Sequence, residues 1–396
     1  MDIHNYKGRF ERALQRLEKS DISKKDKEAI YKFKDYCLCQ NISYGKIDTY
    51  LFYLVKFTKM LDKPIEKATK EDIMRVVAKL NQTGLSEQTK KCFKIALRRL
   101  YKILRGVDGK GEYPEEVKWI SINIRNNHKK LPEELLTESE IEELIRNAEN
   151  IRDKALLSTL AESGCRVSEI GLMKIKHISF EEYGARLTVS GKTGTRKILI
   201  INSTPYLQEW VNQHPKNNDS DSYLWYNPRN KSLLSYTGIV SILKKAARRA
   251  GITKRIYPHL LRHTRATHLA HEMSDATMKQ YFGWGQGSQM ASIYIHMSGK
   301  DTDDAILKAN GIEITKEKKE SKLKPITCLR CKTVNSMTSK FCKLCGFVLN
   351  ETEAKVIVQK ECEKEKMDTV LDKLFKDKAV LKVLADRIKQ CGIIQN

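Results

Sequence analysis

The chain has 396 residues, of which 40% are hydrophobic and 31% charged, and its formal net charge is +24. This length predicts two or three domains, and this composition excludes an intrinsically disordered chain. No run of about 18 apolar residues is present, so we expect no membrane partner. The N-terminal segment lacks the apolar run of a secretory signal, which predicts a cytoplasmic protein. The positive charge favours a nucleic-acid partner, because each neutralised phosphate releases counterions.

Residues 1–112 are predicted to form a helical domain, because apolar residues recur there at the helical period and no strand signal has comparable strength. Its last helix, which follows Ser86, has an apolar stripe and a second stripe of cations offset by about half a turn. The cations are Lys91, Lys94, Arg98, Lys102 and Arg105. An ordinary solvated face would carry some glutamate, which is missing here, so we interpret this stripe as a DNA-backbone contact.

A Gly-rich stretch ending at Pro114 opens a linker that we place at residues 113–133. The next domain, 134–310, is predicted to be helical except for three short strands at 177–180, 186–190 and 196–201. The last two strands are joined by Gly191-Lys192-Thr193-Gly194, which is typical of a hairpin turn. The predicted fold class is therefore mainly α with a small three-stranded antiparallel sheet. A charged linker (311–325), a small cysteine module (326–350) and a helical tail (351–396) complete the chain.

Three motifs in the second domain are weak signals when each is taken alone. His259 and Arg262 are three residues apart and share a helix face that suits a phosphate, although chance pairs of this kind are common. Arg166 follows Gly164 in a tight connection between helices, where it could aim at a ligand or simply pair with Glu169 or Glu162. Tyr294 lies near the end of the domain, where a half-buried packing role is the ordinary interpretation.

Together, in this order, the motifs resemble the catalytic domain of tyrosine recombinases, the family of phage integrases and Xer-type resolvases. Gly164-Cys-Arg-Val-Ser-Glu169 is similar to the first arginine box, and the Gly-Lys turn is similar to the lysine hairpin. His259-Leu-Leu-Arg-His-Thr-Arg-Ala-Thr-His-Leu269 is similar to the second box, and Gly283-Trp followed by Ile293-Tyr-Ile-His296 to the nucleophile box. The resemblance covers residues 20–300, and the first domain looks like the family's core-binding domain.

The resemblance implies a set of six catalytic residues, namely Arg166, Lys192, His259, Arg262, Trp284 and Tyr294. The tyrosine would attack a DNA phosphodiester and form a 3′-phosphotyrosine, while the arginines hold the phosphate oxygens. The lysine would protonate the leaving 5′-oxygen, the histidine would assist proton transfer at the tyrosine, and the tryptophan would brace the phosphate. The family more often has histidine at the tryptophan position. No metal or other cofactor is implied for catalysis.

The resemblance also implies double-stranded DNA as substrate and a homo-oligomer on that DNA, a tetramer in the synaptic complex. Two other functions fit parts of the pattern. A type IB topoisomerase uses nearly the same residues to relax supercoils, and a non-catalytic DNA-binding regulator could carry the cysteine module. Integration or excision of a mobile element and resolution of chromosome dimers are not distinguished by the sequence.

The cysteine module contains two C-x-x-C knuckles, Cys328/Cys331 and Cys342/Cys345. Four thiolates at this spacing predict a structural zinc site with no open position, and a redox pair is the main alternative. The module resembles a zinc ribbon, which is not part of the usual recombinase pattern and is a feature associated with archaeal integrases. In the tail, apolar residues at three-four spacing from Met367 to Ile388 predict an amphipathic helix. This helix could pack on its own domain or associate with a second copy.

Overall fold

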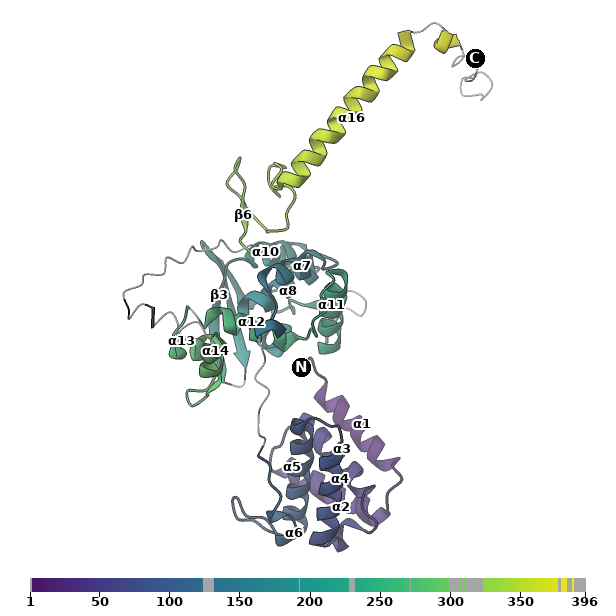
Figure 1. Cartoon of the computed structure of the whole chain (residues 1–396), viewed down its shortest axis with the longest axis vertical. Helices are drawn as coiled ribbons and strands as arrows, with labels where there is room; N and C mark the ends of the chain where they lie inside the picture. Colours follow the sequence, from purple (N-terminus) through teal and green to yellow (C-terminus); the bar gives the residue numbers. More distant parts are fainter. Residues whose placement is uncertain are drawn as a thin grey trace. The chain divides into compact units, whose positions relative to one another are not determined.

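The computed structural model describes residues 2–123, 132–191, 193–227, 232–270, 272–298, 306–307, 310, 323–376, 379–382 and 387. The chain forms two compact units, Met1–Leu131 with Ser235–Thr237 and Pro132–Leu234 with Gly238–Asn396 (Figure 1). Helices dominate both units and the strands form small antiparallel sheets, which confirms the predicted fold class. The finer limits, with linkers at 113–133 and 311–325, stay predictions, and residues 124–131 and 311–322 lie outside the described part.

The first unit is helical throughout its described residues (Figure 1). Three helices begin directly after Ser23, Thr69 and Ser86, because each of these side chains accepts a hydrogen bond from a backbone N–H of the first turn. The start after Ser86 was expected from the sequence. The helical segments are α1 (Tyr6–Glu18), α2 (Lys24–Cys39), α3 (Tyr44–Thr58), η1 (Ile65–Lys67), α4 (Lys70–Gln82), α5 (Glu87–Leu104) and α6 (Glu115–Lys118).

Aromatic side chains from α3 and α5 fill the core of this unit. The Phe57 ring lies 6.4 Å from the Phe93 ring and 6.2 Å from the Tyr101 ring, both in edge-to-face geometry. The Tyr101 hydroxyl donates a 3.0 Å hydrogen bond to the carbonyl of Ile65 in η1. The apolar stripe of α5 is therefore fixed inward, and this sets the direction in which its cationic stripe points.

The second unit combines helices with a three-stranded sheet. Its helical segments before the nucleophile region are η2 (Pro132–Glu134), α7 (Glu138–Arg146), α8 (Ile151–Ser163), α9 (Val167–Gly171), η3 (Ile175–His177), α10 (Thr204–Gln213) and α11 (Tyr236–Arg249). They are followed by α12 (Pro258–Leu269), α13 (Asp275–Phe282), α14 (Met290–Ser298) and, in the tail, α16 (Glu351–Lys376). Short strand pairs are β4 (Tyr226–Asn227) with β5 (Ser232–Leu233) and β6 (Ile326–Thr327) with β7 (Val334–Asn335).

The main sheet has the antiparallel order β1-β2-β3, with β1 (Ile178–Glu181), β2 (Gly184–Gly191) and β3 (Gly194–Ile200). Residues alternate between buried and more exposed along β2, as Leu187 and Val189 do with their neighbours, because successive side chains point to opposite faces. Gly191 pairs with Gly194, so a two-residue turn closes the hairpin as predicted. Lys192, at its tip, lies outside the described residues.

Helix α8 is the centre of the second unit and contacts α7, α10, α12 and β3. It ends at Gly164, which has a φ of 57° and needs the left-handed region that glycine tolerates. A Cβ at this position would also lie 2.7 Å from the Phe282 ring. The chain therefore turns sharply beside α13, and Arg166 becomes the N-cap residue of α9. The tight connection predicted from the sequence is confirmed.

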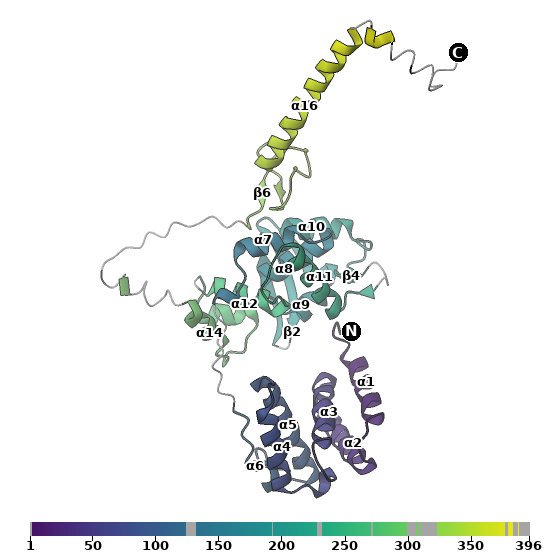
Figure 2. The ribbon, with the colours of Figure 1, turned by 45° about the vertical axis from the view of Figure 1, so that its right-hand side comes forward.

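Helix α16 runs unbroken over 26 residues (Figure 2). The side chains of Met367, Val370 and Leu374 are all exposed, so the described residues do not cover the predicted apolar stripe. No described helix is both long enough and apolar enough to cross a lipid bilayer.

Candidate active site and metal centre

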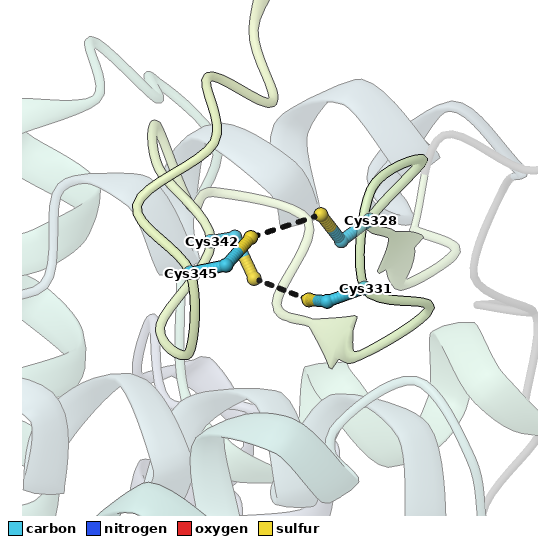
Figure 3. A group of neighbouring side chains, drawn as sticks. All are labelled: Cys328, Cys331, Cys342 and Cys345. Carbon is cyan, nitrogen blue, oxygen red and sulfur yellow. Dashed lines mark hydrogen bonds between the residues drawn. The ribbon is translucent and has the colours of Figure 1, made fainter.

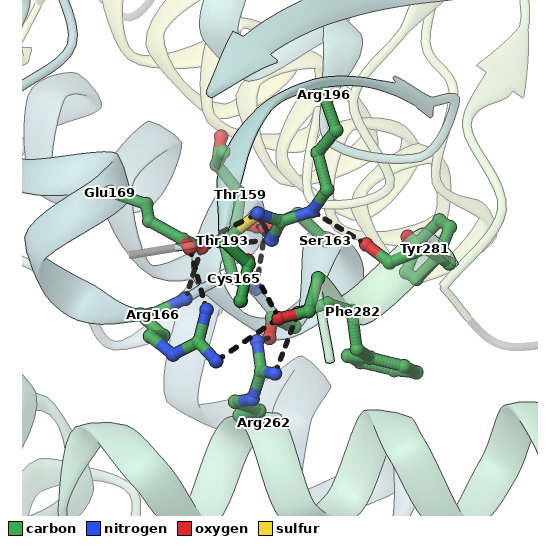
Figure 4. A network of polar contacts seen from close by, with 12 residues as sticks. Thr159, Ser163, Cys165, Arg166, Glu169, Thr193, Arg196, Arg262, Tyr281 and Phe282 are labelled. Carbon is green, nitrogen blue, oxygen red and sulfur yellow. Dashed lines mark hydrogen bonds and ion pairs between the residues drawn. The ribbon is translucent and has the colours of Figure 1, made fainter. Parts of the chain in front are cut away.

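Arg166 and Arg262 come from segments 96 positions apart and converge on one stretch of backbone. The Arg166 Nη2 donates a 3.2 Å hydrogen bond to the carbonyl of Gly283, and the Arg262 Nη2 donates a 2.8 Å bond to the carbonyl of Phe282 (Figure 4). Arg262 also donates through Nη1 to the Gly164 carbonyl at 3.0 Å. Consecutive carbonyls therefore hold the two guanidinium groups side by side.

This proximity changes the electrostatics of Arg262. Burial, followed by the positive charge of Arg166, lowers the pKa of Arg262 to about 10. The group still carries its charge at neutral pH. Two cations that lie this close, one of them buried, form a local excess of positive charge that an anionic ligand would offset.

Glu169 is the carboxylate that organises this cluster. Its oxygens accept hydrogen bonds from the Arg166 backbone N–H and Nη1, both at 2.9 Å, and from the Arg196 Nη1 and Nη2 at 3.0 and 2.8 Å. Burial alone would raise the pKa of Glu169, but the hydrogen bonds and charges of Arg196 and Arg166 outweigh it and lower that pKa. Arg166 therefore makes the ion pair that the sequence offered as its alternative role, and it also faces Arg262.

The Arg196 guanidinium connects the sheet to α13. Besides pairing with Glu169, it donates through Nε to the Tyr281 carbonyl at 2.8 Å (Figure 4). The sequence analysis did not select Arg196 and gave Glu169 no role beyond a pairing partner of Arg166. The signal for Glu169 was present in its position three residues after Arg166, which suits a carboxylate at the start of a helix. No local signal pointed to Arg196.

Tyr294 lies in α14 at the end of a stack of aromatic rings. Its ring is nearly parallel to that of Trp284, with centroids 5.5 Å apart, and the Trp284 ring lies 4.8 Å from that of Phe282. The Arg262 Cζ is 5.5 Å from the Trp284 ring centroid. Only 3% of Tyr294 is exposed. Burial raises the pKa of its phenol to about 12, although the charge of Arg262 acts in the opposite direction.

The Tyr294 hydroxyl forms a hydrogen bond with Nδ1 of His263. His263 follows Arg262 directly and lies one helical turn after His259, and the two imidazole rings are 6.3 Å apart. Sequence reasoning assigned the proton transfer to His259 and did not select His263. Spacing could not distinguish them, because residues four apart share one face of a helix.

Of the six predicted catalytic residues, Arg166, Arg262, Trp284 and Tyr294 lie around one site, and His259 lies next to His263. Lys192 is outside the described residues, but its neighbour Thr193 donates to the Gly283 carbonyl at 3.0 Å. Arg166 binds the same carbonyl. The tip of the hairpin therefore reaches the arginine cluster.

Three of the predicted DNA-contact cations on α5 have partners in their own unit. The Arg98 guanidinium lies 3.8 Å from the Tyr113 ring centroid, and the Lys102 Nζ donates to the Gly109 carbonyl at 2.5 Å. Arg105 pairs with Glu116 at 2.9 Å. Lys91 and Lys94 lie earlier on the same helix, and both are partly exposed. Part of the cationic stripe is therefore already engaged in contacts with the segment that follows α5.

The four predicted zinc ligands form one cluster. Their sulfur atoms all lie within 4.8 Å of one another, with Cys328 and Cys345 3.6 Å apart and Cys331 and Cys342 3.4 Å apart (Figure 3). Tetrahedral zinc with Zn–S bonds of about 2.3 Å requires sulfur separations of about 3.8 Å. The cluster is therefore compatible with a structural metal.

The two knuckles also share their backbone geometry. In one, the Cys328 N–H donates to the Thr333 carbonyl at 2.9 Å, and in the other the Cys342 N–H donates to the Phe347 carbonyl at 2.7 Å. The residue after each second cysteine has positive φ, 59° at Lys332 and 71° at Gly346. Two matched turns that point their thiols at one centre are the geometry expected of a metal knuckle pair rather than of a single redox pair.

Comparison with known proteins identifies the class of this chain. The sequence model of the phage integrase family matches residues 134–300. Tyrosine recombinase XerA of Pyrococcus furiosus is 30% identical over 293 residues, which cover 72% of this chain and 95% of the relative. The XerA of Pyrococcus horikoshii is 28% identical over 301 residues, which cover 75% of this chain and 98% of the relative.

Solved structures show the same fold. The site-specific recombinase XerH, in a post-cleavage complex with difH DNA, is 20% identical with a TM-score of 0.57, over 78% of this chain and 90% of that one. A lambda integrase dimer bound to a core site is 16% identical with a TM-score of 0.54, and the match covers 67% of this chain and 76% of that one. The chain therefore belongs to the phage integrase family of tyrosine recombinases. It is an enzyme, a site-specific tyrosine recombinase.

The Glu169 network predicts a stability effect. Replacing Glu169 with glutamine should lower the free energy of unfolding by about 3 kcal/mol at neutral pH, because a buried ion pair loses one partner. Urea unfolding measures this change. The matched control is Glu142→Gln, which removes a more exposed pair with Arg146 and should cost under about 1 kcal/mol. Equal effects of the two substitutions would contradict the central role of Glu169.

The stability difference between the wild type and Glu169→Gln should depend on pH. The folded state lowers the pKa of Glu169, so its stabilising contribution is complete above the unfolded carboxyl pKa of about 4.3 and is lost as the pH falls through the folded value. The difference between the wild type and Glu169→Gln should therefore shrink progressively below about pH 4. A difference of the same size at neutral pH and in that acidic range would show that the carboxylate charge is not the cause.

Proposed function

We propose that the chain cleaves and rejoins double-stranded DNA through a covalent bond between Tyr294 and a 3′-phosphate. The observation that carries this proposal is the convergence of Arg166 and Arg262 on adjacent carbonyls, with Tyr294 stacked on the Trp284 ring beside them. A phosphodiester placed there would meet two planar cationic donors. The relatives XerH and lambda integrase were solved with bound DNA, which supports the same class of substrate.

In this mechanism the two arginines act as electrostatic catalysts. They hold the non-bridging oxygens, on which negative charge builds in the transition state. Their position is fixed before the substrate binds, by Glu169 for Arg166 and by backbone carbonyls for Arg262. Preorganised donors of this kind need little rearrangement during the reaction. Trp284 borders the same site and would donate its indole N–H to the phosphate.

The remaining groups move protons. Tyr294 attacks phosphorus in line, and its phenolic proton is transferred with assistance from the α12 histidine His259. Lys192 supplies a proton to the leaving 5′-oxygen, and the contact of Thr193 with the arginine-binding carbonyl of Gly283 supports this role. The phosphotyrosine conserves the phosphodiester bond energy, so rejoining is the reverse attack by the 5′-hydroxyl and needs no external energy source.

This proposal also assigns a role to the first domain and an oligomeric state to the active enzyme. The helical domain 1–112 would bind the DNA backbone, with Lys91 and Lys94 of α5 as direct contacts and Arg98, Lys102 and Arg105 close behind them. Strand exchange joins two duplexes, so the active form would be a homo-oligomer, a tetramer at synapsis; the relative lambda integrase was solved as a tetramer on a Holliday junction. Because the substrate is genomic DNA, the enzyme would act in the cytoplasm.

A recombinase is a better interpretation than either alternative. The relatives that match most of this chain are tyrosine recombinases, which does not favour a type IB topoisomerase. A non-catalytic regulator would have no reason to maintain the Glu169-braced arginine pair beside a stacked tyrosine. Strand exchange between two short duplexes, as opposed to relaxation of a supercoiled plasmid, distinguishes recombination from topoisomerase activity.

We also propose that Cys328, Cys331, Cys342 and Cys345 bind one structural zinc ion in a ribbon over residues 326–350. The sulfur separations and the matched knuckles support this proposal. Four protein ligands leave no coordination position for a substrate, so the ion would stabilise the ribbon and take no part in DNA cleavage.

The nucleophile is tested by Tyr294→Phe. This substitution removes one hydroxyl and keeps the stacked ring, so the protein should bind DNA normally but form no covalent adduct. Footprinting of the variant on DNA from the gene's own genomic neighbourhood measures binding and identifies the target, and denaturing gels measure the adduct. An adduct formed by this variant would show that another residue is the nucleophile.

The phosphate-binding arginine is tested by Arg166→Ala. Single-turnover cleavage should fall by at least about a thousandfold, because an arginine that stabilises a transferring phosphoryl group contributes this much. Arg146→Ala is the control, since its ion pairs lie on the surface of α7. Near-normal cleavage by Arg166→Ala would remove this residue from the phosphate site.

The zinc proposal is tested by chelation and by Cys328→Ser, with Cys362→Ser as the control because Cys362 is an exposed thiol outside the cluster. The wild type and the control should contain one zinc ion per chain, and chelator should release it and make residues 326–350 sensitive to protease. DNA cleavage should continue after chelation. Cleavage that depends on the metal, or zinc retained by Cys328→Ser, would contradict this assignment.

A further inference from the structure

The Tyr294 hydroxyl is the reacting atom in the proposed function, and His263 contacts it directly. The hydrogen bond joins Oη of Tyr294 to Nδ1 of His263, and the two ring centroids lie 5.8 Å apart. His263 is in α12, which packs against α14. Helix α12 therefore presents both a phosphate-binding cation, Arg262, and an imidazole at the nucleophile.

A phenol in this environment needs a proton acceptor. Tyr294 is 3% exposed, and burial raises its pKa to about 12, so the group is neutral at physiological pH. It must lose its proton as the bond to phosphorus forms. Water has little access to a side chain this buried. The cation nearby, Arg262, can stabilise negative charge but cannot accept a proton, because with a pKa of about 10 it is already protonated at neutral pH.

We propose that His263 is a further catalytic residue, the general base that takes the phenolic proton of Tyr294. This inference rests on the proposed function, since it assigns a role within the same reaction. The imidazole is the side chain best suited to exchange a proton near neutral pH. In the tautomer that carries its proton on Nε2, the Nδ1 atom has the free lone pair that the phenol requires.

The step is balanced in atoms and charge. The Oη–H bond of Tyr294 breaks and its proton moves to Nδ1 of His263, which becomes an imidazolium. The Oη–P bond forms and the bond from phosphorus to the 5′-oxygen breaks, and that oxygen takes a proton from Lys192. During rejoining, Lys192 recovers its proton from the attacking 5′-hydroxyl, and the imidazolium of His263 returns its proton to the departing Tyr294 oxygen.

His259 then has a supporting role. Its ring meets that of His263 nearly at right angles, with centroids 6.3 Å apart. Among the described residues, the groups close to the phenol or the imidazole include His259 and Arg262 on α12 and the uncharged Trp284 ring beside Tyr294. His259 would then assist the transfer from its position beside the base.

The experiment combines His263→Asn with a more acidic nucleophile. Asparagine retains hydrogen bonding to the phenol but cannot take up its proton. The full chain is assayed for covalent adduct in single turnover, on a nicked duplex that contains the site footprinted with Tyr294→Phe. At neutral pH the variant should cleave about a hundredfold more slowly than the wild type. Circular dichroism and footprinting verify that it folds and binds DNA.

Trifluorotyrosine is then incorporated at position 294, in the wild type and in His263→Asn. This phenol loses its proton more readily, so it depends less on a base. Cleavage by the His263→Asn protein should recover at least about tenfold, and wild-type cleavage should change little. His259→Asn is the matched control and should show a smaller loss without this recovery.

Three results would overturn the inference. Normal cleavage by His263→Asn would show that the imidazole is not needed, and a slow variant without recovery would show that His263 only positions the ring. Recovery confined to His259→Asn would make His259 the base. In each case the wild type still forms an adduct that depends on Tyr294, so the proposed function stands. Absence of any adduct from the wild type would instead reject the proposed function.

Discussion

The buried carboxylate of Glu169 determines the geometry of the arginine cluster. Arg166, Arg196 and Arg262 approach one region from three separate elements, and like charges at such short range repel each other. Glu169 offsets this repulsion for Arg166 and Arg196 through four hydrogen bonds, while Arg262 donates to the carbonyls of Gly164 and Phe282. Burial, and after it the positive charge of Arg166, lowers the pKa of Arg262. In the proposed function, a bound phosphate would add negative charge beside the two guanidinium groups and so reduce their mutual repulsion.

The sequence predicted those features that depend on local chemistry. Gly164 stops α8 in a left-handed conformation that glycine favours, and the Gly191–Gly194 turn closes a two-residue hairpin. Pro258 begins α12 because its missing N–H costs nothing in the first turn. The cysteine spacing predicted that four thiols would meet, and they do. In each case the residues that determine the geometry lie within a few positions of the feature.

The features that were missed depend on contacts between distant segments. Glu169 and Arg196 are 27 positions apart, and only the packing of β3 beside α9 and α13 brings them together. The choice between His259 and His263 depends on where α14 crosses α12, which the period of one helix cannot reveal. The partners of Arg98 and Lys102 come from a loop with no regular pattern. Helical periodicity identified the face of α5 but could not show which cations remain for DNA.

In the proposed mechanism, the site separates two requirements of phosphoryl transfer. Charge stabilisation belongs to the Glu169 network, which joins α9, β3 and α13 and does not include the nucleophile. Proton transfer belongs to the packing of α12 against α14, where burial keeps Tyr294 protonated and thus weakly nucleophilic. Arg262 is common to both parts, because it would bind the phosphate and because its charge also lowers the pKa of Tyr294. In the proposed reaction, a phosphate bound to Arg262 would lie beside the cation that opposes the effect of burial on the phenol, so a seated substrate and a deprotonated nucleophile would depend on the same side chain.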